Sequence, residues 1–274
     1  MPRLSAFVTT YNDEDTIRAC LDSLKWADEL VVLDSFSTDR TLEIACEYTD
    51  RVFQQKFRGF GPQKQAALER TTHEWVLFLD SDETLSAPLQ AEIQQRLRAE
   101  PDVDGFTIPR QEQMFWRMAA DGTRHNRFLR LFRRSCTQFS TMPVHAAPVL
   151  RGRAGRLHSP FYHFGERTIH EKIDKLNNYS SGLVTHRIEN GDRGAPLRMI
   201  WYPPLVFVKQ FVLKRQFHNG WAGFIASVCM AFYAFLKCAK VFEERQRQAH
   251  GASPLPADVL PGNEPSPAHP SAAA

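Results

Sequence analysis

The stretch Trp75-Val-Leu-Phe-Leu-Asp-Ser-Asp-Glu83 is the segment from which the fold can be worked out. Its first five residues are all apolar, which is typical of a short strand buried on both faces of a sheet. Asp80 and Asp82 follow at once, where such a strand would end. In an open α/β sheet, ligands bind outside the carboxyl ends of the strands. Two carboxylates at this place can hold Mg²⁺ or Mn²⁺ and leave positions for the phosphate oxygens of a substrate.

The same two acids also have a structural interpretation. Asp80 can cap the end of the strand, and Asp82 can be the N-cap of a helix that begins near Leu85. A motif of two acids is too short to decide between these possibilities, so we use the neighbouring segments to decide.

Strand-like and helix-like segments alternate over the first hundred residues. Strands are expected at 4–10, 30–33, 51–54 and 75–79, and helices at 14–25, 41–48, 63–70 and 88–99. Asp13 and Ser86 are the expected N-caps of the first and last of these helices. This alternation predicts an α/β fold in which a mostly parallel sheet is flanked by helices and joined by right-handed crossovers.

Polar side chains gather on one edge of the predicted sheet. They follow three of its strands: Thr10, Tyr11 and Asn12 after the first, Asp34 and Asp39 after the second, and Asp80 with Asp82 after the fourth. Lys64 opens a helix near the same edge. A single acid at a strand end is usually structural, but this collection, together with a lysine, predicts a nucleotide pocket.

The segment from Asp104 to Leu157 has a different character. Strands are expected at 105–109 and 127–133, and the polar run 118–126 between them is a loop that can shape an acceptor site. Four arginines of this segment can either face phosphates or, as we favour for most of them, lie on a solvated strand face: Arg127, Arg130, Arg133 and Arg134.

Four histidines follow, at positions 145, 158, 163 and 170. Their spacing matches no zinc template. A single histidine that completes a metal site begun by Asp82 is the better hypothesis, and His163 is our candidate.

The C-terminal third is basic and aromatic. Residues 193–242 contain seven basic residues, eleven aromatic residues and no acidic residue. An amphipathic helix is expected at 169–188, and a segment of sixteen residues without a charge, 221–236, is bounded by Lys237 and Lys240. A spanning helix needs roughly 20 apolar residues. In-plane attachment to an anionic membrane surface is therefore favoured over packing in a soluble core and over spanning.

Composition limits the remaining possibilities. A formal net charge of +3 gives no reason to expect a nucleic-acid partner. The five cysteines are scattered and form no C-x-x-C pair, which suits a reducing compartment. The N-terminal residues do not resemble a signal peptide. We expect a catalytic domain at 1–196 in the cytosol, a membrane-associating helical segment at 197–245 and a disordered tail at 246–274.

The motifs in order resemble those of family 2 glycosyltransferases. The residues that carry this resemblance are Val8-Thr-Thr-Tyr-Asn12, Val31-Val-Leu-Asp-Ser35 with Ser37-Thr-Asp-Arg-Thr41, Gly61-Pro-Gln-Lys64 and Leu79-Asp-Ser-Asp-Glu83. A closer similarity, to the lipopolysaccharide core glucosyltransferases that act on heptose, continues through Arg130-Leu-Phe-Arg-Arg134, Val144-His145, Lys175-Leu-Asn-Asn-Tyr-Ser180 and Phe235-Leu-Lys237.

The resemblance implies a GT-A-type fold, a nucleotide-sugar donor, a divalent metal and inversion at the anomeric carbon. Carried over by motif, Thr10, Tyr11 and Asn12 line the nucleotide. Asp34 accepts a hydrogen bond from the base, and Lys64 lies near the base or the diphosphate. Asp80 holds the ribose or a metal-bound water, and Asp82 holds the metal.

The general base is where the sequence departs from the related enzymes. They commonly carry V-H-E, and this chain has Val144-His145-Ala146, so the expected glutamate is missing. Glu83, His145, His163 and Glu166 are the alternatives, and Glu166 is the preferred one.

The leading hypothesis is an enzyme on the cytosolic face of the membrane that glycosylates a lipopolysaccharide-core or other lipid-linked acceptor. A sugar nucleotidyltransferase is less well supported, because Thr10-Tyr-Asn-Asp13 is not the glycine-rich basic signature that it needs. A non-catalytic membrane scaffold is the remaining alternative; the missing glutamate favours it, and the intact Asp80 and Asp82 oppose it.

Overall fold

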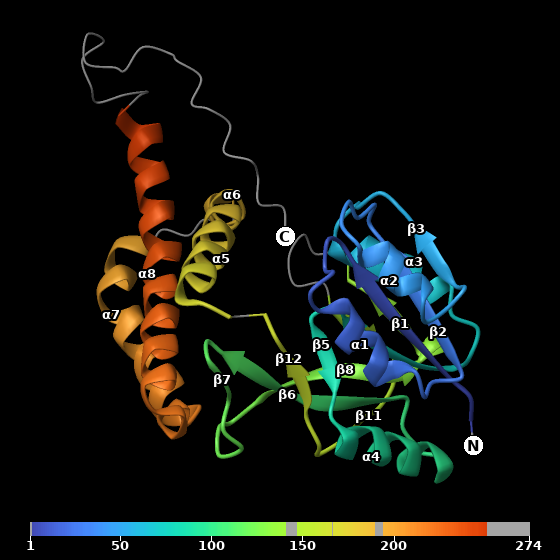
Figure 1. Cartoon of the computed structure of the whole chain (residues 1–274). Helices are drawn as coiled ribbons and strands as arrows, with labels where there is room; N and C mark the ends of the chain where they lie inside the picture. The colour runs from blue at the N-terminus through green and yellow to red at the C-terminus, as the bar shows by residue number, and fades with distance from the viewer. Residues whose placement is uncertain (1, 141–146, 166, 190–193, 251–274) are drawn as a thin grey trace. The chain divides into compact units, whose positions relative to one another are not determined.

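The computed structural model describes residues 2–140, 147–165, 167–189 and 194–250. These residues form two compact units (Figure 1). Unit 1 takes in the described residues up to Gln113 and those from His125 to Gly165. Unit 2 takes in Met114–Arg124 and the described residues from 167 onward. Each unit has its own apolar core and is described by itself.

Unit 1 begins with the predicted alternation of strands and helices. The elements are β1 Leu4–Thr10, α1 Ile17–Leu24, β2 Glu29–Asp34, α2 Thr41–Cys46, β3 Val52–Gln54, α3 Phe60–Glu69 and β4 Trp75–Asp80. Strand β1 pairs in parallel with both β2 and β4, and β2 pairs in parallel with β3. The predicted fold class is confirmed for this half of the sheet.

The sheet then becomes mixed. The further elements of unit 1 are β5 Glu83–Leu85, α4 Ala87–Arg98, β6 Gly105–Met114, β8 Asn126–Arg133, β9 Thr137–Phe139, β10 Pro148–Leu150, β11 Ala154–Arg156 and β12 Phe161–His163. The strand order is β3-β2-β1-β4-β8-β6-β12-β5. Strand β8 runs antiparallel to its neighbours β4 and β6, whereas β12 is parallel to β6.

Helices cover both faces of this sheet, because alternate residues of the central strands are apolar on both sides. On one face, Leu4 and Val8 of β1 pack with the buried residues of α1, α2 and α4. On the other face, Phe7 of the same strand packs with Ala67 and Leu68 of α3. The carboxyl ends of the parallel strands are thus held in a rigid layer.

Of the two expected helix caps, Asp13 is wrong and Ser86 is confirmed, and the structural alternative for Asp82 is wrong as well. Helix α1 has Thr16 at its N-cap and no side-chain cap, because the Asp13 carboxylate is engaged elsewhere. Asp82 does not cap a helix, since the chain continues into strand β5. Ser86 does cap α4, and its hydroxyl accepts a hydrogen bond from the amide of Leu89.

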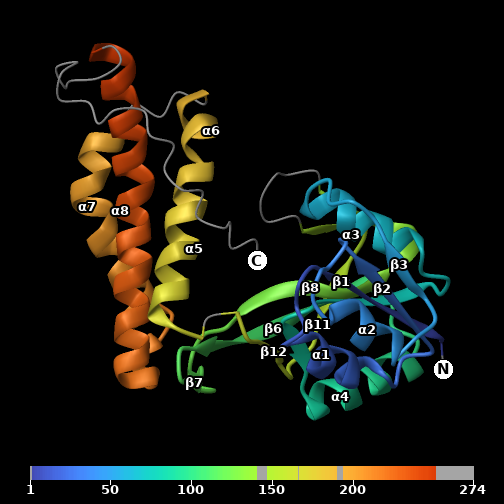
Figure 2. The ribbon, with the colours of Figure 1, turned by 45° about the horizontal axis from the view of Figure 1, so that its top comes forward.

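Unit 2 is mostly helical. Its elements are β7 Arg117–Met118, α5 Ile169–Gly182, α6 Val184–Glu189, α7 Ala195–Val208, a π-helical turn Lys209–Leu213, a 3-10 turn Gln216–Asn219 and α8 Gly220–His250. Figures 1 and 2 show α7 lying along α8. The predicted loop between the strands of the middle segment belongs to this unit: Asn219 accepts a hydrogen bond from the amide of Ala120 and donates one to Thr123.

Helix α8 is longer than the sixteen-residue segment that the apolar pattern predicts. It has 31 residues, because the charged residues after Lys240 continue the helix with pairs such as Glu243–Arg247. Within the described residues, the helix over Gln216–Ala249 is long and apolar enough to cross a membrane, judged by length and composition alone. One such helix is weak evidence for a membrane span.

Candidate active site

The three polar strand ends meet at one edge of unit 1, as predicted. The strand register pairs Thr10 with Asp34 and Thr9 with Asp80, so β1, β2 and β4 end side by side. Because all three strands run parallel, their following loops share this edge. The candidate site is built from these loops and from residues of α3, β6, β8 and β12.

The loops after β1 and β2 are tied together by hydrogen bonds. The buried Asp34 carboxylate accepts from the amide and hydroxyl of Ser37 and from the side chain of Gln54. Asn12 reaches across, since its amide donates to the Ser37 hydroxyl at 2.9 Å and its Oδ1 accepts from the amide of Thr38 at 2.8 Å. The two loops therefore form one preorganised wall of the site.

Asp13, which the sequence suggests only as a cap, connects this wall to β4. Its Oδ2 accepts hydrogen bonds from the Thr10 hydroxyl at 2.8 Å, from the amide of Tyr11 at 3.0 Å and from the Ser81 hydroxyl. Ser81 lies between the two acids of the D-S-D motif. The bonds of Asp13 thus set the path of the chain at both strand ends.

Asp80 is held by two cations. Lys64 Nζ lies 2.5 Å from Oδ1, and Arg130 Nη2 lies 3.1 Å from Oδ2. Burial alone would raise the pKa of Asp80, but Lys64 and Arg130 outweigh it and hold that pKa well below its usual range. Asp80 is therefore ionised, and each of its oxygens pairs with a cation. Its use as a metal ligand stays a prediction.

Glu83 lies behind the motif with no exposed surface. Its Oε1 lies 2.5 Å from Arg130 Nη2, and its Oε2 accepts a hydrogen bond from the amide of Asp80 at 3.0 Å. Burial raises the pKa of Glu83 to about 7, against the attraction of Arg130. The geometry supports a role in fixing the D-S-D turn, and its use as a general base stays a prediction.

Asp82 faces a histidine from a distant part of the sequence. His163 Nε2 lies 3.2 Å from Asp82 Oδ2, and His163 Nδ1 lies 2.6 Å from Glu112 Oε2. Burial alone would lower the pKa of His163, but the two carboxylates outweigh it and raise that pKa to about 10. Gly165 packs on the ring, where an added Cβ would come 2.5 Å from Cε1 and 3.3 Å from Asp82 Oδ2.

Asp82 and His163 can hold a divalent cation only if the cation displaces the proton that Asp82 and Glu112 stabilise on His163. A metal-binding histidine usually gives its other ring nitrogen to a carboxylate, as His163 does to Glu112. Asp82 and His163 supply an oxygen and a nitrogen ligand, a combination that suits Mn²⁺ better than Ca²⁺. Among the described residues no group of three or more His, Cys, Asp or Glu side chains could hold a metal ion. Asp82 and His163 are thus the two candidate ligands among the residues that the structure describes.

The structure brings most of the predicted site residues together. On this edge of unit 1 lie Thr10, Asn12, Asp34, Lys64, Asp80, Asp82, Glu83 and His163, with Tyr11 more exposed than the rest. His145 and Glu166 lie outside the described residues, so their roles stay predictions.

One residue of the site contradicts its expected environment. Most of the four arginines in this segment are expected on a solvated strand face, yet Arg130 is 4% exposed and its guanidinium carbon lies 4.0 Å from the centre of the Phe78 ring. The register of β8 against β6 pairs Leu131 with Phe106 and Leu129 with Thr107, which leaves Arg130 as the extra residue of a β-bulge. Bulges often redirect a side chain beside an active site. The expectation rested on how often charged side chains lie on a solvated face.

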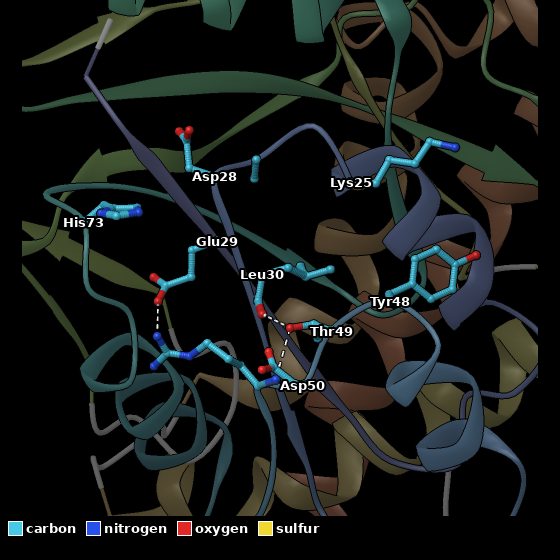
Figure 3. A pocket seen from close by; sticks show the side chains of 10 residues that line it. Lys25, Asp28, Glu29, Leu30, Tyr48, Thr49, Asp50 and His73 are labelled. Carbon is cyan, nitrogen blue, oxygen red and sulfur yellow. Dashed lines mark hydrogen bonds and ion pairs between the residues drawn. The ribbon is translucent and has the colours of Figure 1, made fainter.

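A cavity of about 600 Å³ lies at the opposite edge of the sheet (Figure 3). It is lined by Lys25, Ala27, Asp28, Glu29, Leu30, Tyr48, Thr49, Asp50, Arg51 and His73. Its polar groups already bond to one another: Glu29 pairs with Arg51, and the Thr49 hydroxyl donates to the carbonyl of Leu30. We assign it no part in the chemistry, because Glu29 begins the strand that Asp34 ends.

Comparison with known proteins identifies the family. The family model for glycosyl transferase family 2 matches residues 5–152. The lipopolysaccharide core biosynthesis glycosyltransferase LpsC of Rhizobium meliloti is 31% identical over 94% of this chain and 97% of that protein. An uncharacterized glycosyltransferase of Rickettsia felis is 30% identical over 89% of this chain and 90% of that protein.

Alignments of this chain with two solved structures have low TM-scores. TarS of S. aureus, residues 1–349 with UDP-GlcNAc, aligns with a TM-score of 0.46 and 18% identity over 90% of this chain and 92% of that chain. Glucosyl-3-phosphoglycerate synthase of Mycobacterium tuberculosis with Mn²⁺ and UDP-glucose aligns with a TM-score of 0.35 and 26% identity over 41% and 44%. The sequence matches carry the conclusion: the chain is a glycosyltransferase and belongs to glycosyl transferase family 2.

Proposed function

We propose that the protein transfers a sugar, with inversion, from a nucleotide-sugar donor to a lipopolysaccharide-core or other lipid-linked glycan acceptor. The observation that carries the proposal is the arrangement of Asp82, His163 and Glu112 beside the ionised Asp80. The name of the relative LpsC supports an acceptor from the lipopolysaccharide core. Membership of family 2 weighs against the sugar nucleotidyltransferase and the non-catalytic scaffold.

The proposed donor lies along the wall made by the first two loops. Thr10, Tyr11 and Asn12 line the nucleotide, with Asp34 toward the base. Lys64 and Arg130 form a cationic floor that keeps Asp80 ionised, which places positive charge where a diphosphate would approach. A bound Mg²⁺ or Mn²⁺ on Asp82 and His163 would neutralise negative charge on the departing diphosphate.

The acceptor hydroxyl must lose its proton to a base. Glu83 is poorly suited, because its carboxylate is fully buried and bonded to Arg130 and to the amide of Asp80. Glu166 remains our proposed base, since it directly follows Gly165, which packs on His163. His145 is the second candidate.

A screen of nucleotide-sugar donors tests the proposed site. UDP-, GDP- and ADP-sugars are added to the protein with Mn²⁺ or with EDTA, and melting temperature and donor hydrolysis are measured. We expect one donor to raise Tm only when Mn²⁺ is present, because oxygens of the donor diphosphate would join Asp82 and His163 in coordinating the metal. Stabilisation that is equal in EDTA would contradict the metal assignment, and no response to any donor would favour the scaffold.

We also propose that unit 2 attaches the protein to the inner face of the cytoplasmic membrane. The hairpin face is the set of exposed apolar side chains of α7, the turn and α8: Leu197, Ile200, Trp201, Leu205, Val208, Val212, Leu213, Phe217, Trp221, Phe224, Val228, Phe232 and Phe235. Large exposed apolar side chains gathered on neighbouring helices are typical of a protein or membrane contact. Residues 194–242 include six Lys or Arg and no acid, which suits anionic lipid.

The geometry of the hairpin face favours in-plane attachment. On α8 its side chains run from Trp221 to Phe235, roughly 21 Å at 1.5 Å per residue, whereas the hydrocarbon core is roughly 30 Å thick. The opposite side of the helix, with Ala222, Ala226 and Cys238, is buried within unit 2. A one-sided apolar stripe is typical of an interfacial helix.

Placing negative charges on the hairpin face should release the protein from membranes. The double variant Trp221→Glu/Phe224→Glu is expected to bind phosphatidylglycerol-containing vesicles at least tenfold more weakly in flotation, because each large side chain contributes about 1.5–3 kcal/mol on burial. The control is Val149→Glu, which adds a charge at an exposed apolar residue of unit 1. Equal binding by both variants would contradict the hairpin face, and resistance of the wild type to alkaline extraction would identify a spanning helix instead.

A further inference from the structure

Phe36 has an unfavourable backbone conformation and little packing to compensate for it. The backbone φ of Phe36 is +65°, in the left-handed region that residues with a Cβ rarely adopt. Its side chain is 48% exposed, so burial of the ring does not offset the strain. Strained residues of this kind cluster at binding and catalytic sites, where the surrounding structure enforces them.

The surrounding structure enforces this conformation through the wall of the candidate site. Asp34 precedes Phe36 by two residues and binds the amide of Ser37 at 3.0 Å. Ser37 in turn accepts a hydrogen bond from the amide of Asn12, and Asn12 Oδ1 accepts one from the amide of Thr38. The turn is fixed on both sides of Phe36, and its ring is held out toward solvent.

The position of the ring at the sheet edge points to a ligand. Tyr11 follows β1 and Phe36 follows β2, and the two strands end at the register pair Thr10 and Asp34. Both rings are exposed, at 37% for Tyr11 and 48% for Phe36. By contrast, Phe57 on the next loop and Phe60 at the start of α3 are exposed but contact each other, with ring centroids 5.1 Å apart.

We propose that Phe36 is a donor-binding residue whose ring stacks on the nucleobase. This inference rests on the proposed function, because it needs a nucleotide donor at this edge. Aromatic side chains bind the flat faces of all bases, whereas Lys64 and the metal ligands recognise only charge. Phe36 therefore contributes to binding of the nucleoside part and not of the diphosphate.

The test separates the base from the phosphates. Dissociation constants are measured by calorimetry for UMP, GMP and AMP and for pyrophosphate with Mn²⁺. Phe36→Gly is expected to weaken binding of the preferred monophosphate about tenfold and to leave pyrophosphate binding unchanged, because stacking involves the base alone. Phe36→Tyr keeps an aromatic ring and should bind within about twofold of the wild type.

The melting temperature provides a second measurement, and for it we expect no loss in the glycine variant. Glycine adopts a positive φ readily, so Phe36→Gly should melt no lower than the wild type even though it binds nucleotide more weakly. Phe57→Ala removes an equally exposed ring from the next loop and serves as the control, with monophosphate binding unchanged.

Four outcomes would overturn the inference. Unchanged monophosphate binding by Phe36→Gly would exclude the stacking role, and an equal loss of pyrophosphate binding would show that the ring only shapes the site. A fall in Tm of several degrees would show that it packs in the fold. Failure of the wild type to bind any of the three monophosphates would overturn the proposed function and this inference together.

Discussion

Replacing Asp82 by asparagine is expected to lower donor turnover by on the order of 10²–10⁴-fold while the protein stays folded. A bound metal supplies several kcal/mol of charge stabilisation to the departing phosphate, and each ~1.4 kcal/mol is a factor of ten in rate. Asparagine keeps the shape of the side chain but removes the charged oxygen that faces His163. Initial rates at saturating donor and Mn²⁺ measure the effect, and the melting temperature reports the fold.

The matched control is Glu112→Gln, which acts on the same site through the histidine. Glu112 contacts Nδ1 of His163 and is a positioning residue, so its loss should weaken Mn²⁺ affinity by roughly 10–100-fold. Saturating Mn²⁺ should restore most of the rate in Glu112→Gln and none in Asp82→Asn. Full activity of Asp82→Asn with an unchanged Mn²⁺ requirement would remove Asp82 from the metal site.

The edge that carries Asp80 and Asp82 could be predicted because it depends on local patterns. Short apolar runs that end in polar residues predict buried parallel strands, and parallel strands place their ends on one edge. Strand β1 has the predicted bounds Leu4–Thr10, and β4 ends one residue later than predicted, at Asp80. The pairing of His163 with Asp82 could only be a hypothesis, since β12 joins the sheet through non-local contacts with β5 and β6.

Arg130 could not be predicted, for a physical reason. In a regular strand, Phe128, Arg130 and Phe132 would share one face. The bulge at Arg130 instead places Phe128 and Leu131 in one core and Leu129 and Phe132 in the other. A bulge of one residue leaves no clear mark on the sequence, so the alternation could not show that Arg130 lies beside Asp80. No pattern in the sequence marked Glu112 as a residue of the site either.

Replacing Arg130 by methionine is the second large effect that we expect. Arg130 is the buried cation shared by Asp80 and Glu83, and its removal leaves Glu83 without its closest counter-charge. Breaking a buried ion pair from one side costs about 3–5 kcal/mol, because the remaining charge stays in a poorly solvating site. Urea denaturation should show this loss of unfolding free energy.

The source of the loss can be isolated with Glu83→Gln. If the uncompensated carboxylate causes the instability, the double variant Arg130→Met/Glu83→Gln should be more stable than Arg130→Met alone, although it carries one more substitution. Such a positive coupling is expected for residues that share a buried ion pair. A double variant whose losses simply add would show that Arg130 stabilises the fold through its packing on Phe78.

The pH dependence gives an independent measure of the same charge. The pKa of Glu83, about 7, lies above the ~4.3 of an unfolded glutamate, so the folded state binds this proton more tightly. The group therefore contributes stability at low pH that is lost as pH rises from about 4.3 to about 7. Without Arg130, the pKa of Glu83 rises further, so the loss of unfolding free energy continues above pH 7. The gap in unfolding free energy between Arg130→Met and wild type should thus widen from pH 6 to pH 8, and Glu83→Gln should abolish that widening.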